Sequence, residues 1–317
     1  NVTLTLTANG AGLCPSVIDQ FVLTITPTPT ANAGSDSEIC QGSTFGFFSQ
    51  VTPASASNFS SLAWTKTGGT GTIINGNTLT PTYIPGVGET GTITFTLTAN
   101  SPGSCAPAVD NMVLTITTPP TVNAGSNAEV CQGPNFNFGT RGTPATAIGF
   151  NTITWSGGTG SFLPNANTLN PTYVPGVGET GNIIFTLTAT GNGSCATKTS
   201  TFTLTITPAV AVNAGSNAEV CQGLTFNFGT RATLATASNF NTIAWTGGAG
   251  TLTNGNTLNP IYTPGVGETG VVTFTLTATG NGSCATQTST MQLTITPAVN
   301  VNAGANAEVC QGPNFNF

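Results

Sequence analysis

The chain has 317 residues, enough for two or three ordinary domains, and 38% of them are hydrophobic, which is sufficient for packed cores. Only 4% are Asp, Glu, Lys or Arg, and the net charge of -6 is spread thinly, so no basic stripe exists to displace the counterions of nucleic-acid phosphates. No apolar stretch reaches the roughly 18 to 20 residues of a membrane-spanning helix, so neither nucleic acid nor membrane insertion of this segment is expected.

A repeat of about 90 residues organises the sequence. The phrase Asn-Ala-Gly begins at Asn32, Asn123, Asn213 and Asn302, at spacings of 91, 90 and 89 residues. A Cys-Gln-Gly phrase, a Trp, a Tyr and a Pro-Gly-Val-Gly-Glu-Thr-Gly phrase keep the same period: Cys40, Cys131, Cys221 and Cys310; Trp64, Trp155 and Trp245; Tyr83, Tyr173 and Tyr262; Pro85, Pro175 and Pro264. A unit of this length is a whole domain rather than a solenoid coil.

Short strands are predicted within each repeat. In the first complete repeat they follow the chain as the Cys-Gln-Gly segment, 44–48, 61–65, 71–74, 77–83, 92–99 and 112–117. Ile93, Phe95 and Leu97 alternate with threonines, the period of two that turns apolar groups inward. Gly, Pro and Asn separate the strands, and no helical period occurs. Seven strands with a Trp in the third predict an all-β, immunoglobulin-like Greek-key sandwich, with strands named A to G.

The phase of the repeat divides the chain into five parts. Residues 1–31 align with 92–122 and are expected to form strands F and G of one repeat. Complete repeats are expected at 32–122, 123–212 and 213–301, and 302–317 is expected to open a further one. The array is expected to continue in both directions. Short connections rich in Pro and β-branched residues predict a stiff rod.

Eight cysteines in evenly phased pairs predict disulfides and an oxidising compartment. Cys40 has two candidate partners, Cys14 and Cys105. Since the start of strand A and the F–G loop lie at one end of such a sandwich, the expected bridges lie within single repeats. They are Cys40 with Cys105, Cys131 with Cys195 and Cys221 with Cys284, and Cys14 and Cys310 are expected to pair outside this sequence.

The sequence predicts no enzyme, no metal site and no cofactor. It has no His, and each repeat offers two recurrent glutamates, one before the Cys and one in the Val-Gly-Glu-Thr-Gly loop. The strand order is expected to place Glu38 and Glu89 at opposite ends of a repeat, which excludes an acid–base pair. Solvated loop residues are the favoured interpretation, and calcium held between a loop glutamate and the leading glutamate of the next repeat is the alternative.

The aromatic residues are expected in the core rather than on a carbohydrate-binding surface. They include the three Trp residues and the pairs Phe136 and Phe138, and Phe226 and Phe228. The glycosylation sequons at Asn58, Asn192 and Asn281 matter only if the producing cell glycosylates them.

Interdomain ion pairs are a further hypothesis. Two of the four basic residues, Arg141 and Arg231, occupy the same repeat position, and the loop glutamate of the preceding repeat is expected to approach each. The expected pairs are Glu89 with Arg141 and Glu179 with Arg231. The first repeat has Gln50 at this position, so the junction before it is expected to be looser. The alternative is solvated charges that never meet.

The phrases NAGSNAEVCQG, TYxPGVGETG and FTLTATGNGSCAT, together with the mid-repeat Trp, resemble the immunoglobulin-like (PKD-like) repeats of very large surface proteins of Bacteroidota, among them gliding-motility adhesins and other type IX secretion substrates. The resemblance covers the whole chain. It implies a bacterial cell surface, an extracellular location, and a stalk or filament whose partners are neighbouring repeats and other filament or cell-surface components. Spacer repeats in a secreted multidomain enzyme, and an S-layer or sheath component, are the alternatives.

Overall fold

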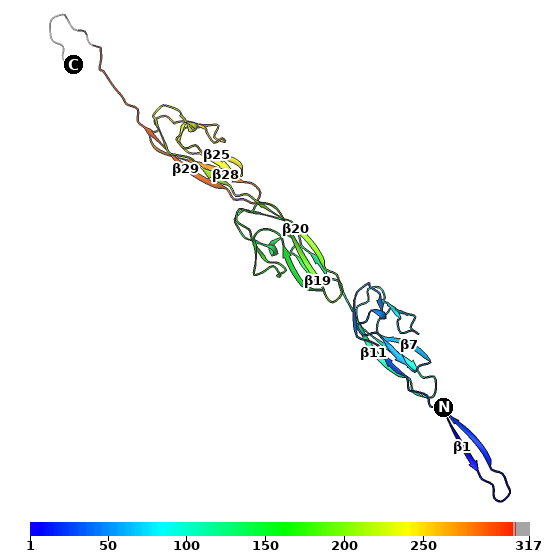
Figure 1. Cartoon of the computed structure of the whole chain (residues 1–317). Helices are drawn as coiled ribbons and strands as arrows, with labels where there is room; N and C mark the ends of the chain where they lie inside the picture. Colours follow the sequence, from blue (N-terminus) through cyan, green and yellow to red (C-terminus); the bar gives the residue numbers. More distant parts are fainter. Residues whose placement is uncertain (307, 309–317) are drawn as a thin grey trace.

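The computed structural model describes residues 1–306 and 308. Three β-sandwiches follow one another in an elongated row, preceded by a β-hairpin, and the chain enters at one end of the row and leaves at the other (Figure 1). In the described part of the chain the only helical elements are 3₁₀ turns, η1 (Phe47–Ser49), η2 (Phe138–Thr140) and η3 (Phe228–Thr230). None of them has the length or apolar character needed to cross a membrane.

The first hairpin has the strand register of a repeat's last two strands. It consists of β1 (Val2–Ala8) and β2 (Val17–Leu23), in which Val2 pairs with Leu23. Ile93 pairs with Leu114 at the equivalent position of the next repeat. All residues of β1 and β2 are exposed, since no second sheet covers them in the described structure.

Each sandwich has nine short strands, and the three follow the same order. The first has β3 (Thr30–Asn32), β4 (Ser37–Cys40), β5 (Phe45–Gly46), β6 (Ser55–Ser57), β7 (Ser61–Thr67), β8 (Thr72–Ile74), β9 (Thr82–Ile84), β10 (Gly91–Asn100) and β11 (Ala108–Thr117). The second has β12 (Thr121–Asn123), β13 (Ala128–Cys131), β14 (Phe136–Asn137), β15 (Thr146–Ile148), β16 (Phe150–Ser156), β17 (Ser161–Leu163), β18 (Thr172–Val174), β19 (Gly181–Gly191) and β20 (Lys198–Thr207). The third has β21 (Ala211–Asn213), β22 (Ala218–Cys221), β23 (Phe226–Asn227), β24 (Thr236–Ser238), β25 (Phe240–Thr246), β26 (Thr251–Thr253), β27 (Ile261–Thr263), β28 (Gly270–Gly280) and β29 (Gln287–Thr296).

The strand order is that of an immunoglobulin-like sandwich. In the first unit one sheet runs β4-β11-β10-β7 and the facing sheet runs β5-β9-β8, with β3 paired to β6 beside them. Relative to the seven expected strands, A is divided into β3 and β4, and B into β5 and β6. The all-β prediction is confirmed. Strand β6, in the small polar sequence Ser-Ala-Ser, carries no apolar alternation by which it could be found.

The repeated Asn-Ala-Gly phrase is the break in strand A. The Asn32 side chain accepts a hydrogen bond from the Gly34 backbone at 2.8 Å, and Gly34 has φ +86°, a conformation that favours glycine. The turn moves the chain from β3, which pairs with β6 antiparallel, to β4, which pairs with β11 parallel. Ala33, between them, is fully buried.

Aromatic rings fill each core, as the sequence predicted. Trp64, Trp155 and Trp245 are buried, with exposed fractions of 6%, 3% and 4%, so they form no exposed platform. In the second sandwich Phe138 lies edge-on to Trp155, with ring centroids 4.9 Å apart. Phe138, Phe226 and Phe228 are buried, and Phe136 is half-buried.

Strand pairing bears on the expected repeat boundaries. β3, β12 and β21 begin at residues 30, 121 and 211, two residues before the boundaries expected at 32, 123 and 213. Each pairs with a strand of the repeat that follows it: β6, β15 or β24. The connections 118–120 and 208–210 are therefore only three residues long.

Candidate functional site

The contacts between successive sandwiches form the candidate site, because each junction is crossed by a disulfide. Cys40 at the end of β4 is bonded to Cys195 in the β19–β20 loop, with Cα atoms 4.8 Å apart. Cys131 at the end of β13 is bonded to Cys284 in the β28–β29 loop, with Cα atoms 4.7 Å apart. Each bridge joins one sandwich to the next.

The expected bridges within single repeats are therefore wrong: Cys40 does not pair with Cys105, nor Cys131 with Cys195, nor Cys221 with Cys284. The start of strand A does lie beside the F–G loop, but the cysteine stands at the far end of that strand. In the parallel pairing Cys40 is opposite Thr117, where β11 ends, whereas Cys105 precedes the start of β11. The ten residues of β11 separate them by about 33 Å.

Three cysteines are unbonded in the described structure. Cys14 and Cys221 are exposed, and Cys105 is partly buried. Cys105 lies with its sulfur 3.5 Å from the carbonyl oxygen of Thr26, just as the sulfur of Cys195 lies 3.5 Å from that of Thr117. Cys105 thus occupies the position that is bridged at the other junctions. Cys310 is outside the described residues.

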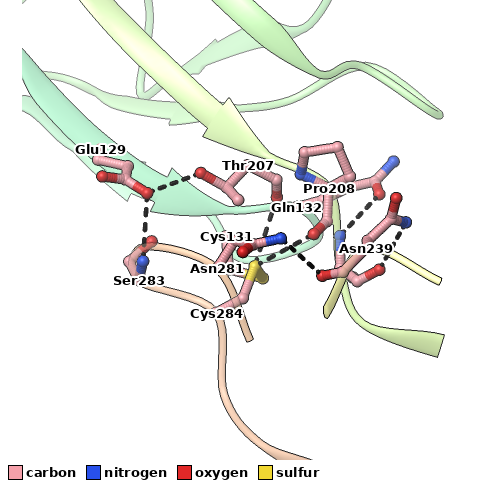
Figure 2. The surroundings of a disulfide bond; sticks show 10 residues. Glu129, Cys131, Gln132, Thr207, Pro208, Asn239, Asn281, Ser283 and Cys284 are labelled. Atoms are coloured by element: carbon pink, nitrogen blue, oxygen red, sulfur yellow. Dashed lines mark hydrogen bonds between the residues drawn. A yellow bond between two sulfur atoms is a disulfide. The ribbon is translucent and has the colours of Figure 1, made fainter. Parts of the chain in front are cut away.

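Hydrogen bonds attach the linker to both neighbours at the second junction. The Ala209 backbone N–H donates to the Gln132 side chain at 3.3 Å, and its carbonyl accepts from the Asn239 side chain at 3.0 Å. Gln132 belongs to the preceding sandwich and Asn239 to the following one. Asn281 donates to the Asn239 carbonyl at 3.1 Å, which connects the disulfide loop to the same contact (Figure 2).

The first junction has Pro119 where the second has Ala209. Proline has no backbone N–H and cannot make the bond that Ala209 makes to Gln132. The backbone bond at the strand end is kept: Gln41 donates to the Thr117 carbonyl at 2.8 Å, as Gln132 does to the Thr207 carbonyl at 2.8 Å.

The leading glutamate of each repeat also lies at the junction. Glu129 accepts hydrogen bonds from the Thr207 hydroxyl at 2.7 Å and from the backbone N–H of Ser283, in the next sandwich, at 3.2 Å (Figure 2). These bonds, the Thr207 hydroxyl first, lower the pKa of the Glu129 carboxyl. A Cβ at Gly282 would collide with this carboxylate, so glycine is needed for the close approach.

The Glu38 carboxylate likewise lies against Gly193 of the second sandwich. Glu38 and Glu129 are both exposed, as expected of solvated residues, but they also lie at the junctions, where Glu129 hydrogen-bonds to the next sandwich. The sequence did not indicate this position, because it depends on which end of strand A carries the glutamate.

The loop glutamates have an internal role. Glu89 accepts hydrogen bonds from the Tyr83 hydroxyl at 2.7 Å and from the backbone of Thr70, Gly71 and Gly86 at 2.5 to 3.1 Å. Burial acts to raise the pKa of Glu89, but these bonds outweigh it and lower the pKa below its ordinary value. Burial and the same carboxylate raise the pKa of Tyr83 to about 12. Glu179 with Tyr173, and Glu268 with Tyr262, repeat the arrangement.

The expected ion pairs of Glu89 with Arg141 and of Glu179 with Arg231 do not form, because both partners are engaged within their own sandwiches. Arg141 is 5% exposed and donates to the carbonyls of Phe138, Ala124 and Ser126. Its guanidinium carbon lies 3.8 Å from the centroid of the Phe202 ring. Arg231 donates likewise to Phe228 and Ala214.

Gln50 in the first sandwich performs the same task as these arginines. It is 5% exposed and donates to the carbonyls of Ala33 and Ser35 at 3.0 and 2.9 Å. These two carbonyls lie in the break between β3 and β4, where the backbone has no partner strand. The position therefore closes a backbone turn within a sandwich, and the looser junction expected from Gln50 has no basis in these contacts.

The two glutamates of one repeat lie toward the same end of the sandwich, not at opposite ends as expected. Glu38 pairs with Thr115, and Gly91, which follows the Glu89 loop, pairs with Ile116. The leading glutamate of the next repeat lies at that repeat's far end, so the two glutamates do not come together as the alternative of a calcium site between them requires. Within residues 1–306 and 308, no three His, Cys, Asp or Glu side chains gather as metal ligands would.

Comparison with known proteins supports the fold. No family model matches the chain, and no curated protein matches it. An I-band fragment of titin matches with a TM-score of 0.54 and 13% identity over 87% of this chain and 100% of that chain, and an E-to-A variant of the same three titin domains matches with a TM-score of 0.52 and the same identity and coverage. Immunoglobulin domains 1–5 of Sidekick-1 match with a TM-score of 0.38 and 15% identity over 87% of this chain and 60% of that chain.

The likeness to titin decides the architecture. Three successive sandwiches of this chain correspond to three successive immunoglobulin domains. The chain is a tandem array of immunoglobulin-like domains. Its two disulfides fit an extracellular protein, since such bonds persist in oxidising compartments.

Proposed function

We propose that this chain is a structural repeat region that forms the stalk or filament of a secreted adhesin on the surface of a bacterium of the Bacteroidota. Its partners are neighbouring repeats of the same chain and other filament or cell-surface components, and it carries no catalytic site and no cofactor. The repeat units are those expected from the sequence, with the boundaries at 32, 123 and 213 moved to 30, 121 and 211 and the boundary at 302 kept.

The covalent bridge between successive sandwiches carries the proposal. The same bridge occurs at both junctions between complete sandwiches, Cys40 to Cys195 and Cys131 to Cys284. A flexible spacer needs no bond between its domains, because its use is to let attached modules move independently. A shaft needs its domains held in line, and the bridge, the three-residue linkers and the contacts of Ala209 do this.

The composition supports an extracellular, mechanically simple role. The chain has few charges, and its polar residues are mainly threonine, serine and asparagine. The outward face of β10, for example, carries the half-buried Thr94, Thr96 and Thr98, opposite the buried Phe95 and Leu97. Near-identical repeats allow a shaft to change its length without a change in the structure of its units.

The alternatives are spacer repeats in a secreted multidomain enzyme and an S-layer or sheath component. Sequencing of the gene outward from these residues separates them. Many further repeats followed by an adhesive domain support the shaft, whereas a catalytic domain supports the spacer.

Location is tested on the source cells. Antibodies raised against the 317-residue chain are expected to label intact cells, and external protease is expected to remove the label. Labelling only after permeabilisation would contradict the proposal. Deletion of the gene is expected to reduce attachment of the cells to surfaces.

A further inference from the structure

Each junction is crossed by two covalent connections, the peptide linker and the disulfide. The linker leaves the last strand of one sandwich and enters the first strand of the next. The disulfide leaves the end of strand A, at β4 or β13, and enters the loop before the last strand of the next sandwich, β20 or β29. Strand A and the last strand are neighbours in one sheet and run parallel.

Following the bonds along the row gives two interlaced paths. One passes through β4, the Cys40–Cys195 bond, β20, the linker 208–210 and then β21 and β22. The other passes through β11, the linker 118–120, β12 and β13, the Cys131–Cys284 bond and then β29. Each path alternates between a peptide linker and a disulfide.

In the second sandwich both paths avoid the segment between its two bridged cysteines. One path enters at Cys195 and the other leaves at Cys131, so residues 132–194 lie on neither path. This segment contains β14 and β16 to β19 of the two main sheets, and β15. These residues contribute Trp155, Tyr173 and Phe185 to the hydrophobic core. The segment also connects Cys195 to Cys131, but it is slack while the sandwich is folded, because its residues turn back and forth across one sandwich. Tension along the folded row therefore need not pull on the strands that hold this core together.

We propose that the disulfides turn the array into a two-path covalent tether, in which tension is shared by strand A and the last strand of each sandwich while the other strands are shielded. The biological use of this tether rests on the proposed shaft function. The property itself belongs to the folded chain and is measured on it alone.

The bond pattern sets the maximum length of the oxidised chain. Between Cys40 and Cys284 the backbone alone has 244 residues, and the two paths through one bond each have 89 residues, 196–284, and 91 residues, 41–131. A third route uses both bonds: it crosses from Cys40 to Cys195, returns along the backbone to Cys131 and crosses to Cys284, with only 64 residues of backbone, 131–194. This shortest route sets the limit, so at about 3.4 Å for each extended residue the maximum lengths are roughly 830 Å for the reduced chain and 220 Å for the oxidised chain.

The three routes also determine how the chain yields. The path through the Cys40–Cys195 bond lengthens only if the third sandwich opens, the path through the Cys131–Cys284 bond only if the first opens, and the route through both bonds only if the second opens. Extension between Cys40 and Cys284 therefore requires all three to open together. With Cys131→Ser only the Cys40–Cys195 bond remains, so the third sandwich alone must open, and the maximum length increases by 25 residues, about 85 Å.

Single-molecule force spectroscopy tests this on the 317-residue chain held by terminal tags, with Cys14, Cys105, Cys221 and Cys310 replaced by Ser to prevent bonds between molecules. Oxidised chains are expected to extend about 610 Å less than chains treated with reductant, because the two bonds remove 180 residues from the route between Cys40 and Cys284, at about 3.4 Å for each residue. The Cys131→Ser chain is expected to extend about 85 Å further than the chain with both bonds, and to show a lower peak force.

Equal extension of oxidised and reduced chains would overturn the tether. A short extension with equal peak forces for one bond and for two would overturn the sharing of load between paths. A native polypeptide that carries a catalytic domain would instead overturn the shaft function, and would leave these lengths unchanged.

Discussion

Cys131 and Cys284 are 153 residues apart in the sequence, yet their Cα atoms lie 4.7 Å apart, because one stands at the end of its sandwich that faces the other's F–G loop. A hydrogen bond also holds the F–G loop that carries Cys284. Ser283, beside the cysteine, donates its backbone N–H to Glu129, two residues before the partner cysteine. A covalent bond and a charged hydrogen bond therefore join the same two segments.

Non-reducing peptide mapping is expected to recover peptides that link Cys40 to Cys195 and Cys131 to Cys284. The reason is that each pair faces across a junction, whereas the cysteines of a single repeat are separated by the length of a strand. Recovery of Cys40 linked to Cys105 would contradict the structure. The Cys195→Ser variant serves as the control, since it removes the first linked peptide and leaves the second.

Glu268→Gln is expected to destabilise the third sandwich by about 1 kcal/mol, because the charged acceptor of three hydrogen bonds is lost. Hydrogen exchange of the β28 amides measures the change for this sandwich alone. Glu219→Gln is the matched control, since it removes the same charge from an exposed position of the same sandwich and is expected to change little. Equal effects of the two variants would mean that the loop bonds contribute nothing.

The same glutamate predicts a pH dependence. Burial acts to raise the pKa of Glu268, but the bonds from Ala249, Tyr262 and Gly265 lower it below its ordinary value of 4.5. A carboxyl with a lowered pKa in the folded state stabilises the fold above its ordinary pKa, and the contribution is lost as the pH falls through the lowered value. Between about pH 6 and pH 3, protection of the β28 amides is expected to fall more in the native chain than in Glu268→Gln. A parallel fall in both would contradict the assignment.

Arg141→Gln is expected to fold normally and to leave the angle between the first and second sandwiches unchanged, because Gln50 already closes the same turn in the first sandwich. Arg141→Leu is expected to cost about 2 kcal/mol, since the carbonyls of Phe138 and Ala124 lose their buried donor. Thermal unfolding measures the stability, and residual dipolar couplings measure the angle. A changed angle in Arg141→Gln would restore a role for the arginine at the junction.

The oxidised chain is expected to scatter X-rays as a rod with a narrow distribution of lengths. The double variant Cys131→Ser with Cys284→Ser is expected to broaden the distribution, because only the linker 208–210 and its hydrogen bonds then hold the second junction. The pair Cys14→Ser and Cys221→Ser removes two cysteines that are unbonded in the described structure, and is the control for loss of cysteine. A native chain as broadly distributed as the double variant would contradict the stiff rod.

Local pattern was sufficient for the fold. The alternation of Ile93, Phe95 and Leu97 with threonines reports which face of β10 is buried, because a strand turns successive side chains to opposite sides. The Trp, Tyr and Phe positions repeat with the same period, and each set is buried in its own sandwich. Which face of a strand is buried depends on near neighbours in the sequence, so the repeat and the all-β sandwich could be predicted, whereas the division of strands A and B and their pairing could not.

The disulfide and hydrogen-bond partners at a junction depend instead on which end of its strand a residue occupies, and on which loop of the next domain faces that end. The eight cysteines indicated disulfides, but the partner of Cys40 depended on the parallel register that sets it opposite Thr117 at the far end of β11. Glu89 and Arg141 were predicted to meet because both are charged, whereas burial and unpaired backbone groups draw each into its own sandwich. The sequence alone therefore determined what each domain is, and only the tertiary structure decided how the domains are joined, because the joining contacts lie between segments about 155 residues apart.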